Sequence, residues 1–578
     1  MKTTDGLDFD DIDRIYHAWE SNFTLSISPR SLAIAFYSWA LHMMVLPGKR
    51  TELLMELSTK FSRYCDYLGY AYENREYPHC FTPTSQDRRF RGPEWNKWPF
   101  NAMAQGFLMV ESFWQSSTTN VHGLSCHHEN VVSFMIRQFL DIFAPSNFIA
   151  TNPEVLARTR EQSGANLARG WFNFLSDFKR ALFREKPVGE EDFRVGENIA
   201  ATPGKVIFRN RLIELIQYSP ATGQVYAEPL LIVPAWIMKY YILDLSPRNS
   251  LAGYLVEKGY TVFMISWKNP DSEDRDICLD DYRTLGVMAA LEVISSVVPE
   301  RKIHTLGYCI GGNILSIAAA AMARDDDDRI GSVTLLTTQN DFTEAGELML
   351  FIDECQVTYL EDIMWYMGCL DTRQMSGAFQ LLRSNDLIWS RYIQDYLLGQ
   401  RRPLSDLMAW NADTTRMPYR MHSQYLRSLF LDNDLATGRY IAGGRPIFLS
   451  DIKGPIFLVA TLRDHVAPWR SVYKFLFQNN AEEITFVLCS GGHNAGIVSE
   501  PGGHARSFRM STRKAGEKHI DPDSWLEKTP EQIGSWWTPW ERWLAKRSSS
   551  LVDPPPMGAP DKGLQPLCDA PGTYVYGQ

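Results

Sequence analysis

The pattern of apolar and polar residues changes once along the chain, close to residue 200. Through residues 10–185, apolar positions recur at the spacing of amphipathic helices, most clearly in 131–143 (VVSFMIRQFLDIF). Asn152 followed by Pro153 and Glu154 is typical of a helix start. We therefore expect a mainly helical N-terminal domain over residues 1–190.

From about residue 206, the apolar residues come instead in short continuous runs. These runs are 206–208, 212–217, 230–233, 261–266, 303–306, 333–337, 456–460 and 484–488. Runs of this length, separated by helical stretches, indicate a largely parallel sheet that is covered by helices on both faces. The expected fold class is α/β, with this second domain over residues 191–548.

The regular spacing of the strands breaks once. About 120 residues separate the strand expected at 333–337 from the one at 456–460, far more than one crossover helix needs. This insertion, about 340–450, contains helical patterns with Trp365, Trp389 and Trp410. It is either a cap over a site, which would leave the residues beneath it buried, or a structural or oligomer-forming subdomain. Residues 549–578, rich in proline and glycine, are expected to form a tail.

The net charge and the cysteine content of the chain exclude some classes of function. The 578-residue chain has a net charge of −10, which argues against nucleic acid as a partner. Its nine cysteines contain no C-x-x-C pair, so neither a disulfide framework nor a zinc ribbon is expected. Seventeen tryptophans, within 12% aromatic residues, suggest contact with apolar surface without saying which surface.

Neither a membrane span nor a cofactor motif is expected. The acidic N-terminus lacks the order of a secretory signal, and the longest apolar stretch, 32–46, is shorter than the roughly 20 residues that a spanning helix needs. No Walker loop or helix-opening G-x-G-x-x-G occurs, and Cys126-His127-His128 lacks the spacing of metal ligands. We therefore expect a soluble, cytoplasmic protein without a metal or nucleotide cofactor.

The sharpest local motif is Gly-Tyr-Cys-Ile-Gly-Gly at 307–312. It directly follows the strand expected at 303–306 and precedes the strongly helix-forming 313–324 (NILSIAAAAMAR). The nucleophile elbow of α/β hydrolases consists of a strand, a G-x-nucleophile-x-G turn and a helix. The glycines on both sides of the nucleophile let the strand and the helix pack closely together. Because no G-x-S-x-G competes elsewhere in the chain, Cys309 is the candidate nucleophile; a buried cysteine in a glycine-rich turn is the weaker interpretation.

A nucleophile elbow requires an acid and then a histidine later in the chain. Asp464 follows the strand at 456–460 within TLRDHVAPW, and His493 follows the strand at 484–488 within SGGHNAG. We expect His493 to take the thiol proton and Asp464 to fix the tautomer and orientation of His493. A helix-capping role is the competing interpretation for Asp464.

A cysteine at the elbow favours acyl transfer from a thioester. Attack on an acyl thioester forms another thioester, so the acyl-enzyme keeps its transfer potential. A thiolate is also reached more easily than an alkoxide beside a histidine and a helix N-terminus. The acyl group then passes to a hydroxyl downhill in energy, provided that water is excluded.

Beyond these motifs, the chain resembles the polyhydroxyalkanoate synthases from about residue 88 to its C-terminus. The matching stretches are APSNF at 144–148, TNPEV at 151–155, TPGKVIFRN at 202–210, PAWIMKYYILD at 234–244, SWKNP at 266–270, GYCIGG at 307–312, WNAD at 410–413, DHVAPW at 464–469 and GHNAG at 492–496. The single-chain length and the GYCIGG form are most similar to class I, the poly(3-hydroxybutyrate) polymerases, which usually take short-chain monomers.

The resemblance implies an α/β-hydrolase fold with a helical cap and an acyltransferase that polymerises (R)-3-hydroxyacyl-CoA with release of CoA. It implies that Cys309 is the acylated nucleophile, His493 the base and Asp464 its partner; in this family the aspartate has also been given a role in activating the monomer's hydroxyl. The amides of Ile310 and Ala235 are expected to form the oxyanion hole. The implied partners are the acyl-CoA, the growing polyester, the surface of cytoplasmic polymer granules and a second copy of the chain in a homodimer.

Two other functions stay open on the residues. The same triad with water as the acceptor would make the protein a thioesterase or polyester depolymerase. A granule-coating or scaffold protein would use the aromatic surface alone, although this hypothesis leaves the order of nucleophile, acid and base unexplained.

Overall fold

A computed structural model describes residues 8–73, 78–83, 87–183, 185–371, 374, 388–502 and 506–577. The chain forms two compact units. The first, which we call the α/β unit, comprises Met1–Glu20, Gly189–Gln374 and Leu404–Gln578. The second, which we call the helical unit, comprises Ser21–Val188 and Met375–Pro403.

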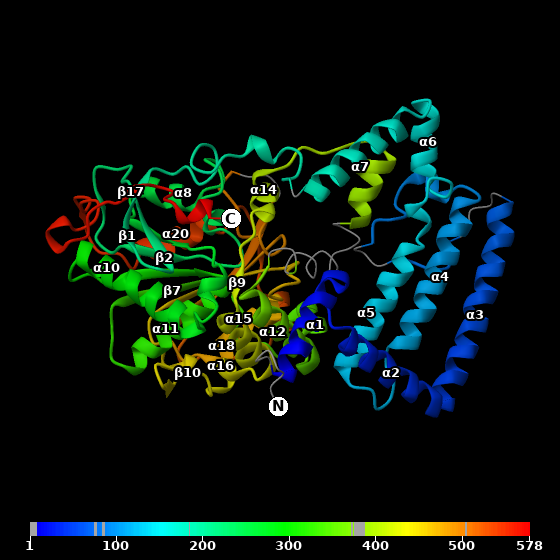
Figure 1. Cartoon of the computed structure of the whole chain (residues 1–578), viewed down its shortest axis with the longest axis horizontal. Helices are drawn as coiled ribbons and strands as arrows, with labels where there is room; N and C mark the ends of the chain where they lie inside the picture. The colour runs from blue at the N-terminus through cyan, green and yellow to red at the C-terminus, as the bar shows by residue number, and fades with distance from the viewer. Residues whose placement is uncertain are drawn as a thin grey trace. The chain divides into compact units, whose positions relative to one another are not determined.

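The helical unit is built on antiparallel helices, of which α3, α4 and α5 pack side by side (Figure 1). Its helices are α2 (Pro29–Val45), α3 (Pro47–Tyr72), α4 (Phe100–Thr118), α5 (Cys126–Ile142), α6 (Pro153–Glu161) and α7 (Ala165–Phe183). The helix start expected at Asn152 is present, because the Asn152 side chain accepts hydrogen bonds from the amides of Glu154 and Val155 at 3.0 and 3.2 Å. No single described helix is long and apolar enough to cross a membrane; α2 and α3, bent by 90° at their junction, pass that test by length and composition only as a pair.

Part of the long insertion belongs to the helical unit. The stretch Met375–Pro403, described from residue 388 onward, groups with this unit and contains Trp389. Asn166 of α7 donates to the carbonyl of Leu397 at 2.8 Å, and Gly170 lies so close to Tyr396 that a Cβ would overlap its backbone. Because these contacts fix the stretch on α7, the insertion is divided between the units instead of forming one body.

The α/β unit is centred on an 11-stranded mixed sheet in the order β15-β14-β13-β12-β7-β6-β4-β5-β2-β1-β17. The strands are β1 (Gly204–Arg209), β2 (Ile213–Tyr218), β4 (Leu230–Val233), β5 (Val262–Trp267), β6 (Ile303–Tyr308), β7 (Ile330–Leu336), β12 (Ile456–Thr461), β13 (Glu483–Cys489), β14 (Ser507–Lys514), β15 (Glu531–Ile533) and β17 (Cys568–Asp569). The six strands from β13 to β5 pair in parallel, and the outer strands pair antiparallel. All eight apolar runs singled out in the sequence lie in strands of this sheet.

Helices bury the sheet through large aromatic and small aliphatic side chains. α11 (Ile310–Arg324) follows β6 and is buried along most of its length, as its alanine-rich sequence allows. α20 (Trp537–Ala545) packs on the sheet because Trp540 Nε1 donates to Thr334 Oγ1 of β7 at 3.0 Å, and the Trp543 ring lies 5.2 Å from that of Phe457 on β12. The tryptophans of this last helix are therefore core residues.

The cap segments within the α/β unit are mostly helical. They include α12 (Glu354–Met367), α14 (Asp406–Ala412) and α15 (Tyr419–Tyr425), and α1 (Phe9–Thr24) contributes residues that contact α12. His17 Nδ1 lies 2.6 Å from Asp362 Oδ2, and Arg14 lies over the ring of Trp365 at 4.9 Å. The described part of α1 is therefore attached to the cap through Arg14 and His17.

The proline- and glycine-rich segment at 549–578, expected to be a tail, is ordered along its described length. β16 (Leu551–Val552) pairs with β3 (Val225–Tyr226), and β17 pairs with β1 through Cys568 and Val206. β17 thus forms one edge of the main sheet, and its pairing with β1 replaces backbone hydrogen bonds to water.

Candidate active site

Cys309 lies at the sharp turn between β6 and α11. Its backbone has φ 52° and ψ −122°, a region that residues with a side chain rarely adopt. Such strain is what places the side chain of an elbow residue at the carboxyl edge of the sheet. The backbone conformation therefore places the Cys309 sulfur at this edge, and the residue is partly exposed.

The flanking glycines are required by close packing. A Cβ on Gly307 would lie 2.5 Å from the Cα of Gly312, and a Cβ on Gly312 would overlap the Thr338 hydroxyl. A Cβ on Gly311 would overlap the carbonyls of Val233 and Pro234. The elbow therefore lies directly against the loop that follows β4.

The structure brings Asp464 and His493 together beside the elbow. Asp464 follows β12 and His493 follows β13, and Nδ1 of His493 lies 2.8 Å from Oδ2 of Asp464. Cys309 lies close enough for its negative charge to act on the imidazole of His493. The three residues chosen from chain order thus lie in one row at the carboxyl edge of the parallel strands, with a hydrogen bond between Asp464 and His493.

The charges in this row are coupled. Burial alone would raise the pKa of Asp464, but the charge of His493, their hydrogen bond and two backbone amides hold it below its usual value. Burial alone would lower the pKa of His493, yet the negative charges of Asp464 and Cys309 and the hydrogen bond to Asp464 raise it well above its usual value. The site is therefore arranged to hold a proton on His493.

Two backbone amides next to the elbow are candidates for binding an oxyanion. Ile310 begins α11, and Ala235 lies in the loop after β4. Neither amide has a hydrogen-bond acceptor among the described residues. A helix N-terminus adds a favourable field for negative charge at Ile310.

The cap reaches the neighbourhood of Cys309 through Tyr425 at the end of α15. Burial, and after it the negative charge of Cys309, raise the pKa of this phenol well above its usual value. Phe342 and Phe430 pack against the Tyr425 ring at 6.3 and 5.6 Å. Complete burial of Cys309, as expected under a closed cap, is not observed, because the residue stays partly exposed beside this aromatic group.

Several supporting residues were not singled out from the sequence. Thr461 donates to Oδ2 of Asp464 at 3.0 Å, and the amides of Val466 and Ala467 donate to Oδ1 at 2.9 and 2.8 Å. An aspartate followed by a tight turn is a known signal for such self-capping of a loop. Asp464 therefore holds its own loop and pairs with His493, but it does not cap a helix, because α17 (Trp469–Tyr473) begins after Pro468 without a side-chain cap.

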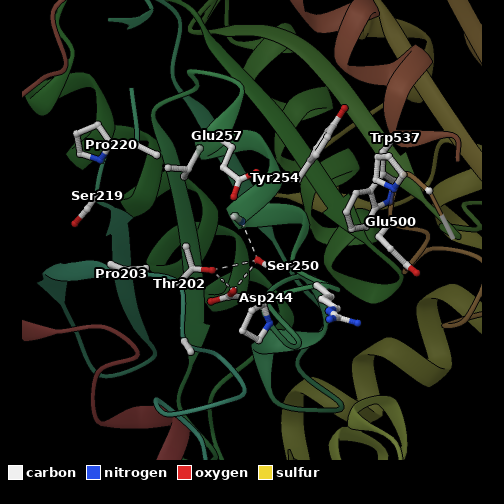
Figure 2. A pocket seen from close by; sticks show the side chains of 18 residues that line it. Thr202, Pro203, Ser219, Pro220, Asp244, Ser250, Tyr254, Glu257, Glu500 and Trp537 are labelled. Atoms are coloured by element: carbon white, nitrogen blue, oxygen red, sulfur yellow. Dashed lines mark hydrogen bonds between the residues drawn. The ribbon is translucent and has the colours of Figure 1, made fainter. Parts of the chain in front are cut away.

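A separate hollow of about 670 Å³ lies elsewhere in the α/β unit. Thr202, Asp244 and Ser250 converge in it, and Asp244 accepts hydrogen bonds from both hydroxyls (Figure 2). Burial raises the pKa of Asp244 to about 6, although these two hydrogen bonds and a third from Tyr218 act to lower it. None of Cys309, Asp464 or His493 lines this hollow, so it is not the candidate active site.

The fold and this site define an enzyme of the α/β-hydrolase class with a cysteine at its elbow. Residues 228–499 match the alpha/beta hydrolase fold family. Residues 86–255 match the poly-beta-hydroxybutyrate polymerase (PhaC) N-terminus, and residues 8–49 match the poly-beta-hydroxybutyrate polymerase N terminal family. The expected α/β-hydrolase fold with a helical N-terminal region is confirmed.

Relatives that match over most of their length identify the family. The poly(3-hydroxyalkanoate) polymerase of Methylorubrum extorquens is 40% identical over 500 residues, which cover 85% of this chain and 81% of the relative. The poly(3-hydroxyalkanoate) polymerase subunits PhaC of Rhizobium meliloti and Cupriavidus necator are 39% and 35% identical, over 85% of this chain and 79% and 83% of their own lengths. The chain belongs to the poly(3-hydroxyalkanoate) polymerase family, and its expected placement among acyltransferases is confirmed.

Among solved structures, a soluble variant of the monoglyceride lipase of Saccharomyces cerevisiae aligns over 62% of this chain and 98% of its own, with 10% sequence identity and a TM-score of 0.35.

Proposed function

We propose that this enzyme polymerises (R)-3-hydroxyacyl-CoA, carrying each acyl group as a thioester on Cys309 and releasing CoA. The observation that carries the proposal is the hydrogen bond between Asp464 and His493 beside Cys309, next to two amides without an acceptor among the described residues. The names of the relatives support the polyester as the class of product.

In the first half-reaction, His493 takes the proton of the Cys309 thiol, and the sulfur attacks the carbonyl carbon of the acyl-CoA. A new carbon–sulfur bond forms, the bond to the CoA sulfur breaks, and His493 gives its proton to the leaving CoA. The amides of Ile310 and Ala235 bind the carbonyl oxygen while it carries negative charge. Asp464 keeps the proton on Nδ1 and stabilises the imidazolium.

In the second half-reaction, a hydroxyl replaces CoA as the partner of His493. The hydroxyl of another hydroxyacyl-CoA, or of a growing chain, loses its proton to His493 and attacks the acyl-Cys309 carbonyl. An ester bond forms, the thioester breaks, and the proton returns to the cysteine sulfur. Because an ester is more stable than a thioester, this transfer needs no further energy source.

The alternative is a thioesterase or polyester depolymerase, in which water takes the place of the hydroxyl. The partial exposure of Cys309 is the observation in its favour, since it gives water access to the acyl group. The buried aromatic group formed by Tyr425, Phe342 and Phe430 favours the synthase, because a dry acyl site slows hydrolysis.

One assay separates these functions. The full-length enzyme is incubated with 3-hydroxybutyryl-CoA, and both CoA release and the product are measured. We expect insoluble polyester and CoA; free hydroxy acid as the main product would establish the alternative. We expect Cys309→Ala to abolish both, and Cys65→Ala, which removes an exposed cysteine of α3, to change neither. CoA release by Cys309→Ala at the parent rate would refute the proposal.

We further propose that the enzyme acts as a cytoplasmic homodimer at the surface of polymer granules and prefers short-chain monomers. The family membership and the GYCIGG motif at 307–312 support this proposal. Light scattering on the purified full chain should give the mass of a dimer, and a fluorescent fusion should label granules in producing cells. Faster turnover of a four-carbon than of an eight-carbon hydroxyacyl-CoA is the expected preference.

A further inference from the structure

A buried carboxylate holds the end of the chain on the α/β unit. Glu214 of β2 has a fully buried side chain and accepts hydrogen bonds from the amides of Thr573 and Tyr574 at 2.8 and 2.9 Å. The Thr573 hydroxyl donates to the same carboxylate at 2.8 Å. Gly572 has φ +84°, and a Cβ there would overlap the Glu214 carboxylate. The segment 572–577, which we call the strap, therefore starts at a position that only glycine fits.

The other end of the strap contacts a buried lysine. The carbonyl of Gly577 accepts hydrogen bonds from Nζ of Lys239 and from Nδ2 of Asn269, the latter at 3.2 Å. Lys239 is buried, with only 4% of the residue exposed. Because burying an ammonium group is costly unless its N–H groups are bonded, the strap carbonyl helps to fix the position of Lys239.

Lys239 lies four residues after Ala235 in the loop that follows β4. Its carbonyl accepts a hydrogen bond from Trp410 Nε1 at 2.8 Å, and its amide donates to the carbonyl of Asp413 at 3.4 Å. Trp410 and Asp413 belong to the cap segment around α14. One residue therefore joins the strap, the cap and the loop that contains a candidate oxyanion amide.

We propose that Lys239 is a positioning residue, through which the strap holds the loop that presents the Ala235 amide to the reacting carbonyl. This inference rests on the proposed function and extends it to a segment far from Cys309 in the sequence. An oxyanion donor acts on charge that develops in the transition state, so its displacement weakens turnover more than ground-state binding. Small displacements of catalytic groups lower rates steeply.

Variants at the two ends of the strap test this connection. Lys239→Met removes the donor to Gly577, and Gly572→Ala displaces the strap from Glu214. Lys205→Met is the matched control, because Lys205 pairs with Asp569 on the exposed surface of the same C-terminal region. The full-length variants are compared for kcat and KM of CoA release from 3-hydroxybutyryl-CoA, with circular dichroism and thermal unfolding as folding controls.

We expect kcat to fall by about tenfold to a hundredfold in each strap variant, with KM within about twofold of the parent and no change in the control. The double variant should be no slower than the slower single variant, since both break one connection. Parent kcat in a folded Lys239→Met variant, or fully multiplicative losses in the double variant, would overturn the inference.

Two further results keep the test decisive. If Lys239→Met does not fold, Asn269→Ala removes the other donor to Gly577 and leaves the lysine in place. Its kcat should fall severalfold at unchanged KM, and parent kcat in folded Asn269→Ala would equally refute the inference.

If Cys309→Ala stays active, the proposed function itself fails. If Cys309→Ala is inactive while Lys239→Met matches the parent, only the role of the strap fails.

Discussion

The phenol of Tyr308 donates a hydrogen bond to Oδ1 of Asn494 at 2.6 Å, which joins the residue before Cys309 to the residue after His493. The Tyr308 ring is buried, and its centroid lies 5.7 Å from that of His493. Asn494 in turn donates from Nδ2 to Oδ1 of Asn411 in the cap helix α14 at 3.3 Å. The strand that presents the sulfur, the loop that presents the imidazole and the cap are thus connected by side chains.

Tyr308→Phe tests whether this connection positions His493. We expect kcat to fall by about tenfold with little change in KM, because the His493 loop loses a restraint. We expect stability to fall by about 1 kcal/mol, the usual value of one hydrogen bond. Rapid-quench acylation and urea unfolding measure the two effects. Tyr473→Phe is the control: its hydroxyl donates to the Ile520 carbonyl at 2.9 Å, so stability should fall without loss of kcat. Equal kcat losses in both variants would contradict the role of Tyr308.

Gly312→Ala tests the packing of the elbow. The added methyl group would overlap the Thr338 hydroxyl and lie 2.8 Å from Thr338 Cβ, so we expect the unfolding free energy to fall by about 2–3 kcal/mol. Gly69→Ala is the counterpart in α3, where nothing lies within 4 Å, and should stabilise that helix by about 0.5–1 kcal/mol. Calorimetry distinguishes the two signs, and a Gly312→Ala variant as stable as the parent would show that the elbow tolerates a side chain.

The central sheet and the candidate triad could be predicted because both depend on local signals in chain order. Each parallel strand contains a short, mostly apolar run, and Cys309, Asp464 and His493 each follow such a run within about five residues. Strands that run in parallel end at the same edge, so residues after them gather there whatever the details of packing.

The outer strands β14, β15 and β17 and the strap could not be predicted, because they depend on partners far away in the sequence. β14 reads SFRMSTRK, whose mixed polarity reflects a position near the edge, and β17 has only two residues. Glu214 looks in the sequence like a solvent-facing residue of a strand, yet its carboxylate is buried under Thr573 and Tyr574. Only the folded chain shows that a glycine at position 572 is what allows this burial.

The burial of His304 on β6 predicts how the free energy of unfolding changes with pH. It hydrogen-bonds to Ser332 at 2.7 Å and Ser548 at 3.2 Å, and burial lowers its pKa to about 4. Because this value lies below that of an exposed histidine, the unfolded chain binds more protons as the pH falls from about 6.5 to 4, and stability falls with it. Between pH 7 and 5 the loss from this residue is on the order of 2 kcal/mol.

His304→Gln should make the dependence of unfolding free energy on pH shallower by that amount. Glutamine keeps a donor and an acceptor for the two serines but does not titrate. Urea unfolding of the parent and variant at pH 7 and pH 5 measures the difference. His422, whose pKa burial also lowers to about 4, remains in the variant, so the dependence is reduced and not abolished. Parallel pH profiles of the two proteins would show that folding does not lower the pKa of His304.

The surroundings of Asp464 bear on whether it acts on His493 alone or also on the substrate hydroxyl. One carboxylate oxygen contacts His493 and Thr461, and the other accepts hydrogen bonds from the amides of Val466 and Ala467. The side chain is fully buried. Because both oxygens are engaged and the side chain is buried, we propose that Asp464 acts through His493 and not on a second hydroxyl.

Asp464→Asn should therefore slow both half-reactions by the same factor, which we expect to be on the order of a thousandfold or more. Loss of the negative charge lets burial lower the pKa of His493 and removes the anchor of its tautomer. Single-turnover acylation of Cys309 and elongation from a preloaded acyl-enzyme measure the two steps separately. Thr461→Val, which removes one donor to Asp464 and keeps its charge, should reduce both steps far less. A variant that acylates nearly normally but fails to elongate would show that Asp464 acts on the hydroxyl after all.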